Sequence, residues 1–244
     1  MSGFERLGMG LGSLPLLGDA RTRSVCPENP TGEKGKGGMA VPDPEKLPFS
    51  AAASDLGQGW KVNPFHKVKS GETLTIMDVD GPGVIQHIWL VADPEKGRSH
   101  IIRFYWDGEE TPSVVSPIGD FFGLGHAAPA YFSSLPLQAS YLGLNCWFPM
   151  PYSTGARITV TNDSDTDTRL YFYVDYQELE RPQDGLGRFH AHWRRQLVTR
   201  STEATGPNAV GTADRLNTSG AGDQQYFILD STIDGILNTN KLAP

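Results

Sequence analysis

Hydrophobic and polar positions alternate with a period of two in several stretches of the chain, which is the pattern of half-buried β-strands. Residues 73–79 (TLTIMDV) and residues 156–162 (ARITVTN) follow it, with Ile158 and Val160 pointing inward. Residues 84–91 (VIQHIWLV) and residues 100–107 (HIIRFYWD) carry large side chains on both faces, as strands in a sandwich interior do. The pattern predicts an all-β fold whose central unit runs from residue 84 to residue 125.

Residues 168–179 (TRLYFYVDYQEL) are also expected to form a strand, on which one face is apolar. The polar segment 162–168 connects it to residues 156–162, so we expect these two strands to form an antiparallel hairpin. Residues 123–151 show weak periodicity and are expected to be mostly loop, with one strand near NCWFPM. Residues 190–197 (HAHWRRQL) are read as a short helix.

Changes in composition divide the chain into four parts. Glycine, proline and small polar residues dominate residues 1–59, which predicts a loop-rich N-terminal arm. Residues 60–199 are expected to hold the β-sandwich, and residues 200–224 a flexible linker. The apolar stretch QYFILD then begins residues 225–244, the expected start of a second, truncated domain.

Charge and composition narrow the classes of partner. The net charge of −7 argues against a nucleic-acid surface, which needs clustered Lys and Arg, and favours a neutral partner such as a sugar. No window reaches the roughly 18 apolar residues of a membrane span, and no signal peptide is seen, so we expect a cytoplasmic protein without a membrane partner. The two cysteines, Cys26 and Cys146, lack zinc-type spacing and are expected to be buried free thiols.

Three short motifs are rejected as cofactor or metal sites. Residues 35–40 (GKGGMA) satisfy the letters of the dinucleotide fingerprint but lie between loop segments, whereas the fingerprint needs a strand before it and a helix after it. Residues 163–174 begin like a calcium loop but lack its Gly and its closing Glu. His190 and His192 have no third ligand candidate nearby. We therefore expect neither a cofactor nor a metal.

Four acidic residues cluster in the central unit, and glycoside hydrolysis requires a pair of carboxyl groups. Asp107, Glu109 and Glu110 also form the pattern of an exposed β-turn. Asp120 lies among aromatic residues, where a partly desolvated carboxylate must be hydrogen-bonded, either for structure or for a ligand. Trp147 beside Asn145 is typical of an aromatic platform for sugar or of a core side chain. The candidate substrate-binding residues are Asp120, Asn145, Trp147 and Glu110.

Longer blocks of sequence resemble the first half of glycoside hydrolase family 172, the former domain-of-unknown-function 2961 group. The resemblance runs in order from about Leu7 to Asp230. It implies a jelly-roll β-sandwich that is the first half of a double jelly roll, and retaining activity on α-D-fructofuranosides and α-D-arabinofuranosides. The blocks are RTRSVCPENPTGEKGKGGMA, LGQGWKVNPFHKVKSGETLTIMDVDGPGVIQHIWL, RFYWDGEETPSVVSPIGDFFGLG, SSLPL, NCWFPMPY, YFYVDY and FHAHWRR.

The resemblance supplies no catalytic residue to this chain. The two catalytic glutamates of the family belong to the second half, in a block like KFYIDGD…GTEDYF that echoes RFYWDGEE…IGDFFG, and they would lie beyond Pro244. In the first-half echo, Gly119 stands where the second half has Glu, and Asp120 aligns with the neighbouring Asp. We therefore expect a chain of the furanosidase type that is truncated before the two catalytic glutamates and is inactive on its own.

A non-catalytic role is the alternative. A lone jelly roll can serve as a carbohydrate-binding or self-assembling structural module. The expected partners are a furanose-containing oligosaccharide or glycan, together with further copies of the chain in a trimer-based homo-oligomer or a complementary second half.

Overall fold

The computed structural model describes residues 20–42, 53, 55–93, 96–125, 128–182 and 185–195. The chain divides into two units, Met1–Trp193 and Arg194–Pro244, and the fold described is that of the first. The expected linker at residues 200–224 and the expected second domain at residues 225–244 lie outside the described residues.

The described part of the chain forms two β-sheets, as the alternation of apolar positions predicts. Eight strands form the larger sheet. Six of them lie in the order β1 (Arg21–Val25), β12 (Thr168–Glu178), β4 (Gly83–Val91), β9 (Gly143–Cys146), β8 (Leu137–Ser140), β7 (Phe132–Ser133). The other two are β10 (Met150–Tyr152), which pairs with β4, and β2 (His66–Val68), which pairs with β12.

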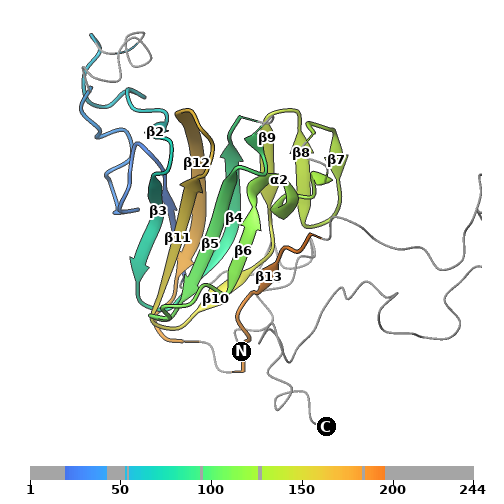
Figure 1. The fold of residues 1–244 in the computed structure, drawn as a ribbon. Coiled ribbons are helices and arrows are strands. Elements are labelled where there is room, and N and C mark those ends of the chain that lie inside the picture. Colours follow the sequence, from blue (N-terminus) through green and yellow to red (C-terminus); the bar gives the residue numbers. More distant parts are fainter. Residues whose placement is uncertain are drawn as a thin grey trace, which may run out of the picture. The chain divides into compact units, whose positions relative to one another are not determined.

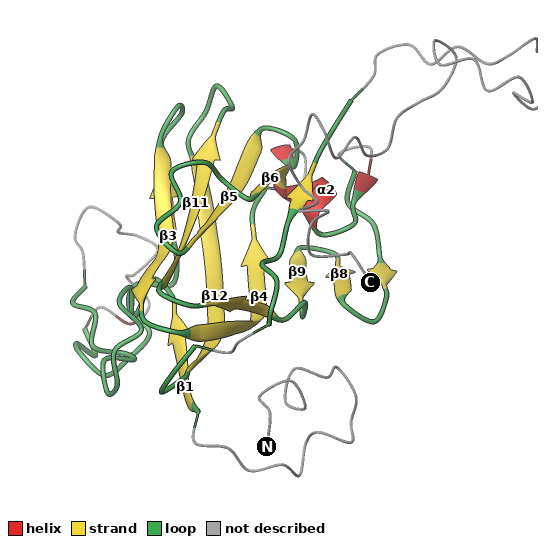
Figure 2. Cartoon of the chain, turned by 90° about the horizontal axis from the view of Figure 1, so that it is seen from below, coloured by secondary structure: helices red, strands yellow, loops and turns green. Residues whose placement is uncertain are grey.

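The smaller sheet has five strands in the described residues and packs against the larger one, so that the two sheets form the layers seen in Figure 2. Four of its strands pair antiparallel, and the short β13 adds to β6 in parallel. The order is β13 (Ala191–His192), β6 (Val114–Pro117), β5 (His100–Trp106), β11 (Gly155–Asn162), β3 (Thr73–Asp80).

The strand order is that of a jelly roll. Eight of the described strands, taken along the chain, are β1, β3, β4, β5, β6, β9, β11 and β12. In the larger sheet four of them lie in the order β1, β12, β4, β9, which are the first, eighth, third and sixth along the chain. In the smaller sheet the other four lie in the order β3, β11, β5, β6, which are the second, seventh, fourth and fifth. Two Greek keys in two facing sheets define this architecture. The predicted all-β jelly-roll sandwich is confirmed (Figure 1).

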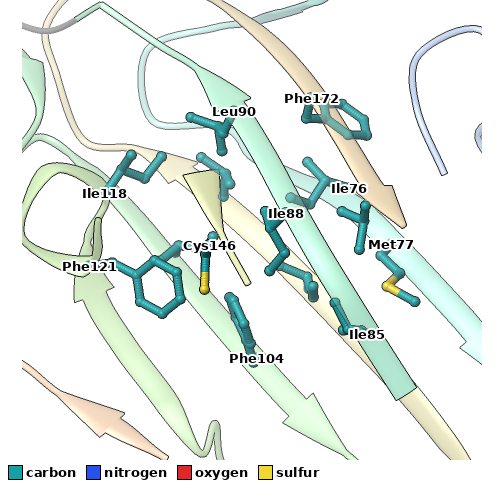
Figure 3. Packing of buried hydrophobic residues seen from close by; sticks show 14 of the residues in the cluster. Ile76, Met77, Ile85, Ile88, Leu90, Phe104, Ile118, Phe121, Cys146 and Phe172 are labelled. Carbon is teal, nitrogen blue, oxygen red and sulfur yellow. The ribbon is translucent and has the colours of Figure 1, made fainter. Parts of the chain in front are cut away.

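Apolar side chains from both sheets fill the space between the layers (Figure 3). Ile88 and Leu90 of β4 face Phe104 of β5, and all three are fully buried. On β12 the alternating residues Leu170, Phe172, Val174 and Tyr176 are buried, as the sequence predicts. Cys26 and Cys146 are buried free thiols, also as predicted, and burial raises the pKa of Cys146 to about 12.

The predicted hairpin between residues 156–162 and residues 168–179 is wrong. These strands, β11 and β12, lie in different sheets, so the segment between them crosses from one layer to the other. The Asn162 side chain holds this crossing, because its amide nitrogen donates to the carbonyl oxygens of Val68, Lys69 and Thr166 at 3.1, 3.2 and 2.9 Å. A local amide network of this kind replaces the ladder that a hairpin would have.

Three other local expectations change. Residues 191–192 form the strand β13 rather than a helix, because Ala191 N and Trp193 N donate to backbone oxygens of Ser113 and Val115. The region 123–151 contains the short strands β7, β8 and β9 and the beginning of β10, where mostly loop with one strand was expected. The described part of the N-terminal arm is loop-rich as expected but contributes β1, which pairs along β12. In the described residues, no helix is long and apolar enough to cross a membrane.

Candidate functional site

The face of the larger sheet that points away from the core carries a group of aromatic and polar side chains. Successive strand residues point to opposite faces, so the residues that alternate with the buried positions of β12 and β4 lie on this face. The register pairs Asp175 with His87 and Tyr173 with Trp89, and pairs Trp89 in turn with Asn145. We call the following set the outer-face cluster: Trp89, Tyr173, His87, Asp175, Asn145 and Trp147.

His87 is the centre of this cluster. Its Nδ1 lies 3.0 Å from Oδ2 of Asp175, and its Nε2 lies 3.1 Å from Oδ1 of Asn145. Both ring nitrogens therefore face oxygen acceptors, an arrangement that only the doubly protonated imidazolium satisfies with two donated hydrogen bonds. The three residues come from three neighbouring strands, β12, β4 and β9, so the sheet itself fixes their spacing.

The electrostatics favour the charged pair. The hydrogen bond to Asp175 raises the pKa of His87 above its ordinary value of 6.5, against the opposing effect of burial. Burial is the largest single influence on Asp175 and opposes its ionisation, but hydrogen bonding, chiefly from His87, and the charge of His87 together outweigh it and lower the pKa of the Asp175 carboxyl. Because the two shifts stabilise opposite charges, the pair is an imidazolium and a carboxylate between the ordinary pKa values of the two groups, 3.8 and 6.5.

Aromatic rings lie on both sides of this polar group. The Trp147 ring stacks on the His87 ring, with centroids 5.3 Å apart and planes inclined by 11°. Trp147 is exposed, so one part of the stack is open to solvent. On the neighbouring strands Trp89 packs against Tyr173, with centroids 5.6 Å apart. The stacking over an indole adds a further reason for His87 to be cationic.

Asp120, a predicted substrate-binding residue, is placed elsewhere. It lies in the short helix α2 (Ile118–Phe121) at the end of β6. Both of its carboxylate oxygens accept hydrogen bonds from Arg98, Oδ2 from Nε at 3.1 Å and Oδ1 from Nη2 at 3.0 Å. The Asp120 side chain is 13% exposed. The sequence leaves a structural role and a ligand-binding role open for this carboxylate. The two hydrogen bonds from Arg98 support the structural role.

Glu110, another predicted substrate-binding residue, is exposed in the segment between β5 and β6. Asp107 in the same turn faces inward: its Oδ1 accepts from the backbone N–H groups of Ser153 and Thr154, each at 2.7 Å. Oδ2 of Asp107 accepts from Nε of Arg188 at 2.6 Å. The acidic turn is therefore one partly buried anchor, Asp107, followed by solvent-exposed carboxylates, rather than a facing pair.

Asn145 and Trp147 are the two sequence candidates that the structure brings together, both against His87. His87 and Asp175 were missed. His87 is a single histidine on a strand with large side chains on both faces, and no local sequence pattern marks it as functional. Asp175 is a single acidic residue in a strand whose other side chains are mostly aromatic or aliphatic. The register between β4 and β12, which pairs residues 88 positions apart, is what creates the site.

The cluster has the chemistry of a binding surface. An Asp–His pair can activate a hydroxyl nucleophile, but here the second ring nitrogen is already bonded to Asn145. Retaining glycoside hydrolysis needs two carboxyl groups about 5–5.5 Å apart, and Asp175 is the one carboxylate of the cluster. Indole rings beside an amide, an imidazolium and a carboxylate suit a ligand with apolar faces and several hydroxyls.

Metal binding has no support in the described residues. No group of three or more His, Cys, Asp and Glu side chains among them is placed to hold an ion. His190 and His192 are both exposed. Asp167, in the segment that resembles a calcium loop, pairs with Lys67 at 2.8 Å.

A comparison with known families gives one match. The family model for the first β-sandwich domain of glycoside hydrolase family 172 matches residues 43–194. The match covers most of the described sandwich, including β4, β9 and β12, which carry the outer-face cluster. A search of curated proteins finds no match to the chain.

Proposed function

Since the chain belongs to glycoside hydrolase family 172 and contains its first β-sandwich domain, we propose that it serves in furanoside hydrolysis by binding a furanose-containing oligosaccharide at the outer-face cluster. The sandwich contributes recognition rather than bond cleavage. The substrates that the resemblance indicates are α-D-fructofuranosides and α-D-arabinofuranosides.

One observation carries the proposal: the open stack of Trp147 on His87, with Asn145 and Asp175 bonded to the same imidazole. An indole offers an apolar plane to the C–H groups of a sugar ring, while the polar atoms around it exchange hydrogen bonds with hydroxyls. The sheet holds these groups rigidly, so little conformational freedom is lost when a ligand binds.

The engagement of the carboxylates supports a role without catalysis. Asp107 is bonded to Arg188, Asp120 to Arg98, and Asp175 to His87. A general acid must hold a proton at its working pH and release it to the leaving oxygen, whereas the pKa values of Asp107 and Asp175 are both lowered. These groups are suited to remaining ionised.

The experiment separates binding from hydrolysis. The purified chain is incubated with 4-nitrophenyl α-D-arabinofuranoside and 4-nitrophenyl α-D-fructofuranoside, and is titrated calorimetrically with an arabinofuranosyl and a fructofuranosyl oligosaccharide. We expect binding to at least one oligosaccharide and no release of nitrophenol. Rapid turnover would contradict the assignment to recognition, and an absence of binding to both oligosaccharides would contradict the assignment to furanosides.

Assembly is a second candidate function, favoured by apolar side chains exposed near β7 and β8. Tyr131, Leu135 and Tyr141 are 81%, 75% and 58% exposed. Exposed apolar side chains that gather on one part of a surface mark interaction sites. We propose a homo-oligomer that covers this patch, and the native mass tests it: a monomer at micromolar concentration would contradict it.

A further inference from the structure

A cavity of about 490 Å³ lies beside the outer-face cluster, between the loop that follows β1 and the segment at Trp60 and Lys61. Tyr173 is the one residue that it shares with the cluster. The volume is within the usual range for small-molecule sites. Nothing in the proposed function uses this cavity. Its glycine-rich wall includes Gly35, Gly37 and Gly38, from the segment that has the letters of the dinucleotide fingerprint but not its flanking strand and helix.

Two buried side chains in the wall have unused acceptor atoms. Glu28 and Asn29 are each 7% exposed. Glu28 uses Oε1 to accept from the backbone N–H of Asn63, and Asn29 uses its amide nitrogen to donate to the carbonyl oxygen of Glu33 at 3.0 Å. Within the described residues, Oε2 of Glu28 and Oδ1 of Asn29 have no hydrogen-bond partner. Buried acceptors are costly to leave unpaired, so a donor that reaches these two oxygens would stabilise the wall.

Two of the three cations in the wall, Arg23 and Lys61, are engaged with other groups, and the third, Lys34, is exposed. Arg23 pairs with Glu178 at 3.0 Å. Lys61 donates from Nζ to the hydroxyl of Tyr173 at 3.2 Å and lies over its ring. Lys34 is opposed by the carboxylates of Glu28 and Glu33 in the same wall, so the cavity offers acceptor atoms rather than an anion-binding surface.

An aromatic side chain and a closed rim complete the cavity. Trp60 lines it and is 56% exposed, so its indole is accessible to a ligand. The rim is closed by a hydrogen bond of 2.7 Å from the backbone N–H of Gly59 to the carbonyl oxygen of Gly38. Both glycines have positive φ, 99° and 71°, which side-chain-bearing residues rarely adopt. The rim is therefore built from residues suited to this close approach.

We propose that this cavity is a second carbohydrate site, which binds a neutral sugar through hydroxyl groups donated to Glu28 Oε2 and Asn29 Oδ1, with Trp60 against the sugar ring. A neutral polyol matches the two unpaired acceptors and the accessible indole together. The site is separate from the stack of Trp147 on His87, so the failure of either assignment leaves the other intact.

The test is a calorimetric titration of the full chain with an arabinofuranosyl trisaccharide, a fructofuranosyl trisaccharide and, as a cationic competitor, spermidine. Glu28→Gln replaces the unpaired acceptor with an amide donor at nearly constant volume. Trp60→Ala removes an exposed ring and is not expected to disturb folding, so it decides the outcome if Glu28→Gln does not fold. Trp147→Ala serves as the control at the other site.

We expect Glu28→Gln and Trp60→Ala each to weaken one binding event at least tenfold, while Trp147→Ala leaves that event unchanged. Wild-type sugar binding in both cavity variants would overturn the proposal, and so would a chain that binds spermidine but neither sugar. If the cavity variants lose binding while Trp147→Ala behaves as wild type, the cavity is confirmed and the outer-face assignment fails.

Discussion

Arg188 donates from Nε to Oδ2 of Asp107 at 2.6 Å, and this ion pair joins the segment after β12 to the turn after β5. The two residues are 81 positions apart in the chain. The same carboxylate accepts from the backbone N–H groups of Ser153 and Thr154 before β11. One side chain thus ties together three connections at one end of the sandwich.

Removing this carboxylate should destabilise the fold. We expect Asp107→Ala to lower the free energy of unfolding by about 1.5–3 kcal/mol, the usual contribution of hydrogen bonds to a charged group. Asp107→Asn keeps one acceptor and tolerates the positive φ of 56° at this position, so it should lose less. Urea denaturation measures both. Equal stability of Asp107→Ala and the wild type would show that the anchor is dispensable.

The His87 pair should make stability depend on pH. Its pKa is raised on folding, so the stabilisation is fully present below the ordinary value of 6.5 and is lost as the pH rises through the folded value. We expect the wild type to exceed His87→Gln in stability by about 0.5–1 kcal/mol near pH 6, below the raised pKa of His87 and above the lowered pKa of Asp175, as for other partly exposed ion pairs, and by less at pH 9. Denaturation at several pH values checks this. A difference that grows with pH would contradict the raised pKa.

Gly83 lies where a side chain has no room. A Cβ at this position would collide with the Tyr152 hydroxyl and lie 2.6 Å from the carbonyl oxygen of Gln177. Tyr152 and Gln177 belong to β10 and β12, the strands on either side of this end of β4. We therefore expect Gly83→Ala to cost about 1–3 kcal/mol, as overpacking does.

Gly125→Ala is the matched control for Gly83→Ala, because a Cβ there meets no atom of the described residues within 4 Å. It should change stability by less than about 0.5 kcal/mol. Thermal unfolding of the two variants makes the comparison. A wild-type melting temperature for Gly83→Ala would mean that the strands beside β4 are spaced differently.

Asp120 and Arg98 should contribute to the stability of the fold rather than to ligand binding. We expect Asp120→Asn to lose about 1 kcal/mol of stability and to keep the sugar affinity of the wild type. The double variant with Arg98→Met should lose less than the sum of the single losses, because both changes remove the same bond. A drop in sugar affinity in Asp120→Asn without a loss of stability would contradict this prediction and would indicate that Asp120 contacts the sugar.

The strands were predictable because side-chain alternation directly reports which face of a strand is buried. Ile158 and Val160 of β11, and the buried positions of β12, follow it. The pairing of those two strands was not predictable. Alternation is the same whether the next strand continues the sheet or crosses to the other one, and the crossing depends on hydrogen bonds of the Asn162 amide that leave no period in the sequence.

The sequence indicated only part of the candidate site, because side-chain alternation does not reveal which strands pair. Trp147 and Asn145 are near neighbours and stand out together as an aromatic beside an amide. His87 and Asp175 meet only through the register of β4 against β12. Asp120 stood out because a carboxylate among aromatics needs a partner, but the local sequence could not show that Arg98 supplies it.

Calorimetric titration of Trp147→Ala with a furanosyl oligosaccharide tests the central claim most directly. Trp147 stacks on His87 and is open to solvent, so its removal takes away the apolar plane and leaves the sheet intact. Tyr131→Ala, which removes an aromatic ring that is 81% exposed and is not part of the outer-face cluster, is the matched control. We predict that Trp147→Ala loses at least tenfold in affinity for the outer-face binding event while Tyr131→Ala binds as the wild type does. Equal binding by Trp147→Ala and the wild type would contradict a carbohydrate site on this face.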